Sequence, residues 1–376
     1  MKMRSSHFSV MMILGMLIAL VCVPFAAVPN VQAAPADELQ LAGFQMMDEM
    51  DGYTWGTHGS TLVLYRTADN GKTWKNIALP TVKASANPVY GRDLFFYDKQ
   101  NGWIVGSNGE RGVILHTVNG GEKWTVLPAP GVGQIASMDF ITPQTGVLLA
   151  SDGNLYLTQD GGTTWKKGSG SFAGSENVKG MLFRDVQNGW ILSPGDDKIP
   201  HLFRTRDGGQ KWELLSLPEL TQVCNSEILS APVFFGSDKK KGWFPARCNK
   251  GDRKQYYVSF TEDGGEHWKV TPIYTKLAGQ FVSAVPLVFA DDQRGWYVQA
   301  QQVYQTTNRG VTWNSTLPDK GLIDAFNAYP NVVQMQFVSI NTGWMLLKSL
   351  DGKKTQLLQS TDGAKSWHVA SPVANK

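Results

Sequence analysis

Apolar and polar residues alternate along most of this chain in short runs, and glycine, asparagine or aspartate interrupts each run. Between residues 91 and 128, for example, the runs are GRDLFFYD, WIVGS, VILHT and KWTVLP. Alternation with a period of two, bounded by turn-forming residues, indicates β-strands. No stretch has apolar residues at a convincing helical spacing. The pattern therefore predicts an all-β protein built from units of four short strands.

An eight-residue motif recurs through the chain at intervals of 41 to 56 residues. We call it the octet. The seven copies are TADNGKTW (67–74), TVNGGEKW (117–124), TQDGGTTW (158–165), TRDGGQKW (205–212), TEDGGEHW (261–268), TTNRGVTW (306–313) and STDGAKSW (360–367).

A second motif lies between the octets and ends in Gly-Trp in five of its seven copies. Its copies are MMDEMDGY (46–53, degenerate), FYDKQNGW (96–103), FITPQTGV (140–147), FRDVQNGW (183–190), FGSDKKKGW (235–243), FADDQRGW (289–296) and FVSINTGW (337–344). Twelve of the 13 tryptophans close a copy of one of the two motifs, and Trp55 lies two residues after the degenerate copy, so we interpret all 13 as packing residues between neighbouring sheets.

Seven units of four strands predict a seven-bladed β-propeller of four-stranded antiparallel blades. A linear stack of the same units would leave sheet edges exposed, which favours closure into a ring. We expect one propeller over residues 40–373, with blades at about 40–80, 90–129, 134–168, 176–218, 229–272, 283–318 and 331–373.

On these motifs the chain resembles the Asp-box, or BNR-repeat, proteins, whose motif is Ser/Thr-x-Asp-x-Gly-x-Thr-Trp. The Gly-Trp turns and the single ring look most like the photosystem II stability/assembly factor-like family, which includes exported bacterial members outside phototrophs. The resemblance implies a scaffold or assembly role at the cell envelope. It does not by itself connect this chain with photosynthesis.

The third octet residue is expected to accept backbone N–H bonds within its turn. In two copies Asn replaces Asp, a change that a hydrogen-bonded turn tolerates and a calcium or catalytic site does not. A fifth-position Gly supplies positive φ, and Ala364 in the last copy predicts a strained or altered turn. The structural residues are Asp69, Asn119, Asp160, Asp207, Asp263, Asn308 and Asp362, with Trp74, Trp124, Trp165, Trp212, Trp268, Trp313 and Trp367.

Strand direction alternates within a blade, so the octets and the Gly-Trp turns should share one face of the ring, here named the octet face. The longer connections should share the other, the loop face, where we expect binding. We expect irregular loops there at 80–93, 168–180, 194–201, 246–257 and 317–331. Cys224 and Cys248 both fall on the loop face, which permits a disulfide; two buried free thiols are the alternative. Beside them, Arg247, Lys250, Arg253 and Lys254 predict a basic patch for an acidic partner, the alternative being an ordinary solvated loop.

Residues 1–33 read as a cleaved signal peptide, with Lys2 and Arg4 before an apolar run and Ala33 at the cleavage site, and residues 34–39 as a linker. An uncleaved membrane anchor is the alternative. Without the leader, the charge falls from +3 to about +1, because two basic residues and no acidic ones are lost, which gives no reason to expect a nucleic-acid partner.

The sequence favours an exported, non-catalytic single ring that is itself monomeric and binds another protein. The partner could be membrane-associated. No cofactor or metal is expected, because the five histidines after the leader are scattered. The chain lacks the Phe/Tyr-Arg-Ile-Pro segment of sialidases, and it has room for one ring where Asp-box xyloglucan hydrolases need two. A carbohydrate-binding or glycoside-hydrolysing, sialidase-like propeller is the alternative function.

Ring closure is the last expectation. The units run in phase from first strand to fourth, so no strand is expected to cross between the chain ends, and blades 1 and 7 should meet by packing alone. We expect the ring to open first at this junction.

Overall fold

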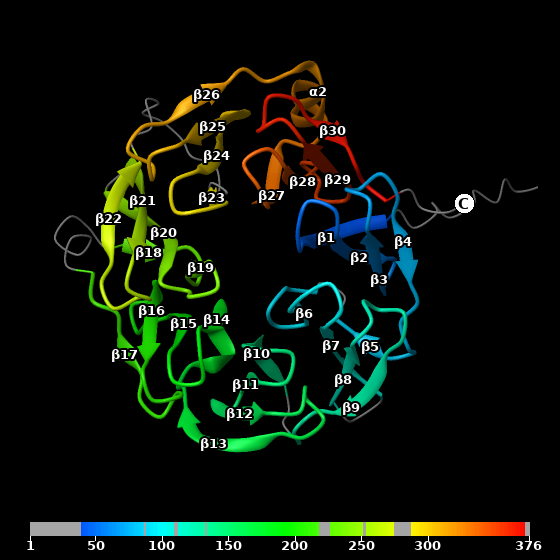
Figure 1. Ribbon diagram of the computed structural model, residues 1–376, viewed down its shortest axis with the longest axis vertical. Coiled ribbons are helices and arrows are strands. Elements are labelled where there is room, and N and C mark those ends of the chain that lie inside the picture. The colour runs from blue at the N-terminus through cyan, green and yellow to red at the C-terminus, as the bar shows by residue number, and fades with distance from the viewer. Residues whose placement is uncertain are drawn as a thin grey trace, which may run out of the picture. The chain divides into compact units, whose positions relative to one another are not determined.

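The computed structural model describes residues 39–85, 88–108, 112–131, 134–217, 226–250, 253–273 and 287–372; for 249, 250, 253 and 254 it describes the backbone alone. Within the unit Asp37–Lys376, seven antiparallel sheets surround a central axis, and the first strand of each sheet is innermost (Figure 1). The predicted seven-bladed all-β propeller is confirmed.

Blade 1 comprises β1 Leu39–Met46, β2 Gly52–His58, β3 Thr61–Thr67 and β4 Lys75–Ile77. Blade 2 comprises β5 Lys83–Ala84, β6 Leu94–Phe96, β7 Gly102–Ser107, β8 Gly112–Thr117 and β9 Thr125–Pro128. Blade 3 comprises β10 Ile135–Phe140, β11 Gly146–Ala150, β12 Asn154–Thr158 and β13 Lys166–Ser171, and blade 4 comprises β14 Gly180–Phe183, β15 Gly189–Pro194, β16 Pro200–Thr205 and β17 Glu213–Leu214. Blade 5 comprises β18 Ser226–Ile228, β19 Val233–Phe235, β20 Lys241–Lys250, β21 Arg253–Thr261 and β22 Lys269–Ile273. Blade 6 comprises β23 Leu287–Phe289, β24 Gly295–Gln299, β25 Gln302–Thr306 and β26 Asn314–Thr316. Blade 7 comprises β27 Asn331–Phe337, β28 Gly343–Lys348, β29 Thr355–Ser360 and β30 His368–Val369.

Blades 2 and 5 depart from the simple pattern, because their first strand is split into two segments that pair with the same second strand. In blade 5 the hairpin of β20 and β21 is also the longest described, at 10 and 9 residues, and it stays paired up to Lys250 and Arg253. The expected irregular loop at 246–257 is therefore wrong, since most of this segment continues the ladder of the blade.

Aromatic side chains fill the gaps between blades. The Trp of one Gly-Trp turn stacks on the Phe that ends the inner strand of the following blade: Trp103 lies 3.6 Å from Phe140 and Trp296 3.7 Å from Phe337, measured between ring centroids. Trp103 and Trp296 are completely buried. Burial of such large apolar surfaces is the main source of cohesion between the sheets.

One octet-face contact recurs in every blade and places the two motifs together. The backbone N–H of the fourth octet residue donates to a carbonyl in the Gly-Trp turn of the same blade, as from Asn70 to Met50 at 3.0 Å and from Gly264 to Lys240 at 2.7 Å. All seven blades have this bond. The octets and the Gly-Trp turns thus lie on one face, and the longer connections on the other.

Blades 7 and 1 are joined by two glutamines of β27, and we call this contact the closing joint. The Gln334 side chain accepts the Phe44 N–H at 3.1 Å and donates to the Phe44 carbonyl at 2.7 Å. The Gln336 side chain accepts from the Met46 N–H at 2.9 Å and donates to the Met46 carbonyl at 2.8 Å. The two amides thereby act like a short strand along the free edge of β1. Among the strands of residues 39–372 that the structure describes, none crosses between the two sheets, as expected, but closure by packing alone is wrong.

A short helix was not expected from the sequence. Helix α2, Lys320–Ala328, lies in a connection that we predicted as irregular, between blades 6 and 7. The Asp319 carboxylate caps it by accepting the Leu322 N–H at 3.0 Å, and Leu322, Ala325 and Phe326 are buried against blades 6 and 7. This i, i+3, i+4 set is a helical face, so the prediction that no stretch has helical spacing is wrong here.

Candidate partner-binding surfaces

The octets form compact hydrogen-bonded turns. In every copy the side-chain oxygen of the third residue accepts the backbone N–H of the seventh at 2.8–3.0 Å, and this holds for Asn119 and Asn308 as well as for the five aspartates. In the fifth copy, hydrogen bonds from the His267 backbone and ring outweigh the opposing effect of burial and hold the pKa of Asp263 at about 2. These oxygens are therefore occupied within their own turns.

The residue just before an octet reaches the octet of the next blade. Arg204 donates to the Gly265 carbonyl at 2.8 Å, between blades 4 and 5. Gln359 donates to the Asn70 carbonyl at 2.9 Å, between blades 7 and 1. The octets therefore connect the blades, in addition to turning the chain within each blade.

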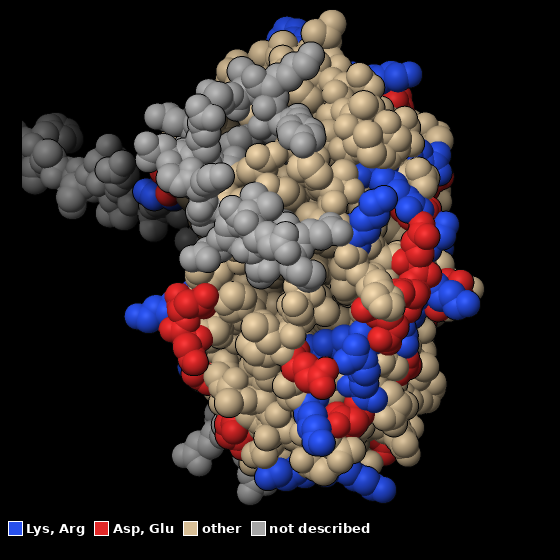
Figure 2. Space-filling view, turned by 90° about the vertical axis from the view of Figure 1, so that its left-hand side faces the viewer, with Lys and Arg blue, Asp and Glu red and all other residues tan. Residues whose placement is uncertain are grey.

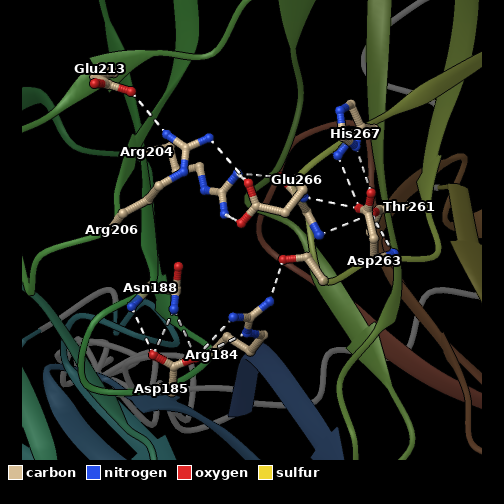
Figure 3. Close-up of polar contacts among 12 residues, drawn as sticks. Arg184, Asp185, Asn188, Arg204, Arg206, Glu213, Thr261, Asp263, Glu266 and His267 are labelled. Atoms are coloured by element: carbon tan, nitrogen blue, oxygen red, sulfur yellow. Dashed lines mark hydrogen bonds and ion pairs between the residues drawn. The ribbon is translucent and has the colours of Figure 1, made fainter.

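Between blades 4 and 5 this contact is ionic, and we call it the ionic joint (Figure 3). The Arg204 side chain is only 2% exposed, lies over the Trp190 ring at 5.3 Å, and binds the Glu266 carboxylate with both terminal nitrogens. Hydrogen bonds and charge from Arg204 lower the pKa of Glu266. Arg184 adds a second bridge by donating to the Gly264 carbonyl at 2.6 Å.

Further ion pairs extend this network from blade 5 to blade 6. Lys241 pairs with Asp292 at 3.1 Å, and Arg309 pairs with Asp292 at 2.6 Å and with Glu262 at 2.5 Å. In side view, Lys, Arg, Asp and Glu side chains crowd one rim of this part of the ring (Figure 2). Because positive and negative groups are paired along the network, it serves mainly to hold blades 4, 5 and 6 together.

The predicted basic patch lies at the end of the blade 5 hairpin. Arg247 is in β20 and donates from Nε to the Glu227 carboxylate of β18 at 3.1 Å, so much of its charge is neutralised within the blade. The side chains of Lys250, Arg253 and Lys254 lie outside the described residues. A patch formed by those three stays a prediction.

The predicted disulfide concerns the same hairpin. Cys248 is in strand β20 rather than in a loop, is 1% exposed and is disulfide-bonded. Cys224 lies outside the described residues, so its pairing with Cys248 stays a prediction. A bond at Cys248 anchors the hairpin near the point where it extends beyond the other strands of the blade.

A cavity of about 690 Å³ opens on the loop face where blades 7, 1 and 2 meet. We call it the seam groove. Its walls come from the loop-face ends of β1, β2, β27, β28 and β29 and from the segment before β6, and include Leu41, Trp55, Tyr90, Val333 and Lys348. The Trp55 and Tyr90 rings lie nearly parallel with centroids 5.7 Å apart. Sequence reasoning missed this groove because segments far apart in the chain form it.

A second cavity, of about 580 Å³, lies on the loop face at blades 2 and 3, and we call it the polar cavity. Lys83, Arg92, Asp93 and Glu176 are among the residues that line it. The Asp93 carboxylate is engaged locally, since it accepts the Val89 N–H at 2.8 Å and pairs with Arg92 at 2.8 Å. Residues 88–93 thus lie between a cavity with one charged lining residue, Lys348, and a cavity with several.

Irregular inner strands shape both cavities. The register of β1 shifts between Leu41 and Gly43, that of β27 between Val332 and Gln334, and that of β10 between Ile135 and Ser137. The residue at each shift, Ala42, Val333 or Ala136, lines one of the cavities. A β-bulge redirects a side chain in this way, and bulges are frequent beside binding sites.

Within the described ranges, no three His, Cys, Asp or Glu side chains gather in a way that could hold a metal ion. The helices described there include none that is long and apolar enough to cross a bilayer.

A family model described as photosynthesis system II assembly factor YCF48 matches residues 30–174, which include the strands of blades 1 to 3. The photosystem II stability/assembly factor HCF136 of Arabidopsis thaliana is 26% identical over 119 residues. The resemblance to this family is confirmed. The aligned part is 31% of this chain and 26% of HCF136, so the chain matches only about a quarter of that relative's length.

Solved structures share the fold over most of the chain. The structure described as YCF48 bound to D1 peptide has a TM-score of 0.57 at 18% identity, covering 87% of this chain and 94% of that one. YCF48 from Cyanidioschyzon merolae has a TM-score of 0.54 at 20% identity, covering 87% and 96%. A GH74 xyloglucanase from Xanthomonas campestris reaches 0.60 at 13% identity, covering 90% of this chain but 55% of the enzyme. At these identities the likeness concerns the fold alone.

Proposed function

We propose that this propeller is a non-catalytic assembly factor that acts at the cell envelope and binds a partner protein through its loop face. The observation that carries the proposal is the seam groove, an open, largely uncharged cavity on the loop face of a ring that resembles assembly-factor propellers. A fold relative described with a bound peptide supports a polypeptide as the ligand.

The chemistry of the two cavities favours binding over glycoside hydrolysis. Most glycosidases place two carboxyl groups on either side of the scissile bond. No carboxylate lines the seam groove. The polar cavity has Asp93 and Glu176, but Asp93 is already bound to a backbone N–H and to Arg92. Neither described cavity therefore offers two unengaged carboxyl groups.

The proposed location rests on the leader. A basic start, an apolar run and Ala33 at a small-residue site support export and cleavage. Mass spectrometry of the protein recovered from the envelope fraction tests this. A mature chain that begins at Ala34 is expected, and recovery of the full-length chain in the cytoplasm would contradict the location.

The binding proposal is tested by capture of partners from envelope extracts on the immobilised protein. Val333→Arg places a charge at a position of the groove that is 45% exposed, so it should abolish capture without unfolding the ring. The matched control is Arg206→Ala on the octet face, where the side chain is 49% exposed, and it should leave capture unchanged. Turnover of xyloglucan or of sialoside reporters by the purified protein would instead establish the carbohydrate alternative.

A further inference from the structure

Lys348 is the one charged side chain among the residues that line the seam groove. It ends β28 on the loop face and is partly exposed. Among the described residues, no carboxylate lies within ion-pair distance of its ammonium group, unlike the paired cations of the ionic joint. The groove therefore presents a positive charge that the described part of the chain does not neutralise.

Apolar side chains from two blades lie around the same opening. Val89, just before β6, is 42% exposed, and Val333 at the bulge of β27 is 45% exposed. Behind them, Leu41 and Trp55 are buried and form the inner wall. Exposed apolar groups at the mouth of a cavity indicate a surface that a partner covers.

We propose that the seam groove binds an extended peptide segment in which an apolar side chain is adjacent to a carboxylate. The apolar side chain enters between Val89 and Val333, and the carboxylate pairs with Lys348. A peptide is the occupant of choice because the groove crosses three blades and is thus longer than one side chain. This assignment rests on the proposed function and adds the chemistry of the partner.

Charge complementarity should determine which peptides the groove prefers. A lysine that is the one charged residue lining a groove attracts Asp or Glu and repels Lys or Arg on the bound segment. Reversing the charge at residue 348 should therefore invert the preference and not merely weaken binding. An inversion cannot arise from partial unfolding, so it separates a role in recognition from one in stability.

A randomised heptapeptide phage library, panned on the full chain, tests the assignment. Peptides with Asp or Glu adjacent to Leu, Ile, Val or Phe are expected to be enriched, and Lys348→Glu should enrich Lys or Arg adjacent to the same residues. Lys353→Glu is the matched control, because Lys353 is exposed in the next turn and does not line the groove. It should select the wild-type peptides.

Selected peptides are then measured by fluorescence anisotropy against matched peptides with Gln in place of the acid. We expect the acidic peptide to bind about 5- to 10-fold more tightly, and the difference to shrink at high salt. Enriched peptides without an acid preference, or unaffected by Lys348→Glu, would overturn this assignment while protein binding itself still stands. An absence of enriched peptides also overturns it, and the capture experiment then decides the proposed function independently.

Discussion

The closing joint and the ionic joint solve the same problem with different chemistry. Both place hydrogen-bond donors of one blade on backbone carbonyls of the next. Between blades 7 and 1 the donors are neutral amides, on Gln334, Gln336 and Gln359. Between blades 4 and 5 they are the guanidinium groups of Arg184 and Arg204. Neutral and charged donors can therefore both connect neighbouring blades through backbone carbonyls.

A third joint shows the same position with an ionisable acceptor. Asp139 precedes the last residue of β10 as Gln336 precedes the last residue of β27. Its carboxylate accepts the Phe183 N–H of blade 4 at 2.6 Å, as Gln336 accepts the Met46 N–H of blade 1. The three joints should accordingly respond differently to mutation, pH and salt.

The largest effect is expected at the closing joint. Replacing Gln334 and Gln336 together by Ala leaves the N–H and C=O groups of Phe44 and Met46 without partners in a part-buried site. Each unsatisfied group costs about 1–3 kcal/mol when it is shielded from water. We expect the free energy of unfolding to fall by about 3–5 kcal/mol in urea titrations.

Gln45→Ala is the control for this variant, because among the described residues the Gln45 amide makes a single hydrogen bond, a long one of 3.5 Å to the Met46 carbonyl. It should change stability by less than about 0.5 kcal/mol. Hydrogen exchange refines the result: in the wild type, the amides of Phe44 and Met46 should be protected as well as those of other inner strands. If these two amides exchange before those of the other inner strands, the ring opens first between blades 7 and 1, as the sequence led us to expect, and the closing joint is weak.

At the Asp139 joint, stability should depend on pH. Burial raises the pKa of Asp139 from the ordinary value of 3.8 to about 6. The folded state thus holds this proton more tightly than the unfolded state, so stability falls as the pH rises from about 4 to about 6 and is level above that. Asp139→Asn should remove the slope and raise stability at pH 7 by about 1–3 kcal/mol. A variant with an unchanged slope would show that the carboxyl is not the source.

The ionic joint should respond to salt. Arg204→Ala removes a buried guanidinium, leaves the Gly265 carbonyl without this donor, and leaves Glu266 with the weaker 3.3 Å ion pair to Arg206. We expect this to cost about 1–2 kcal/mol, because Glu266 is 42% exposed and water can replace the lost partner. The difference from the wild type should shrink as NaCl is raised from low to high concentration. Arg206→Ala, with a half-exposed side chain, should change stability by less than about 0.5 kcal/mol. A loss that salt does not alter would point to the Trp190 packing instead.

The fold was predictable because its signals are periodic and local. Each octet carries its own hydrogen-bond acceptor and turn residues, so seven copies specify seven blades without long-range information. Helix α2 was missed because one turn and a half of apolar residues is a weak signal, although Asp319 as its cap and Pro330 after its end were both readable.

The joints and the seam groove could not be predicted in the same way. Gln334 and Gln336 alternate with apolar residues and look like solvent-facing strand positions, and their partners lie 290 residues away in the chain. The groove is formed by segments of three blades, so no local pattern marks Lys348 or Val333 as neighbours. The partner could not be predicted for the same reason. The motifs predict the propeller, whereas the side chains that distinguish the binding surface of one propeller from that of another lie between the motifs.

The smallest effect is expected at Ala364, the one octet residue at this position that is not glycine. Its φ of 72° is left-handed, which costs an L-residue about 1 kcal/mol, so the expected strain is present in the backbone. Its methyl group, however, is 1% exposed and packs in the core shared by blades 6 and 7, and burying it contributes about 0.8 kcal/mol. The two terms nearly cancel, so Ala364→Gly should change the free energy of unfolding by less than about 0.5 kcal/mol. A clear stabilisation in urea titrations would mean that backbone strain dominates, and would identify this turn as a weak element beside an otherwise well-bonded closing joint.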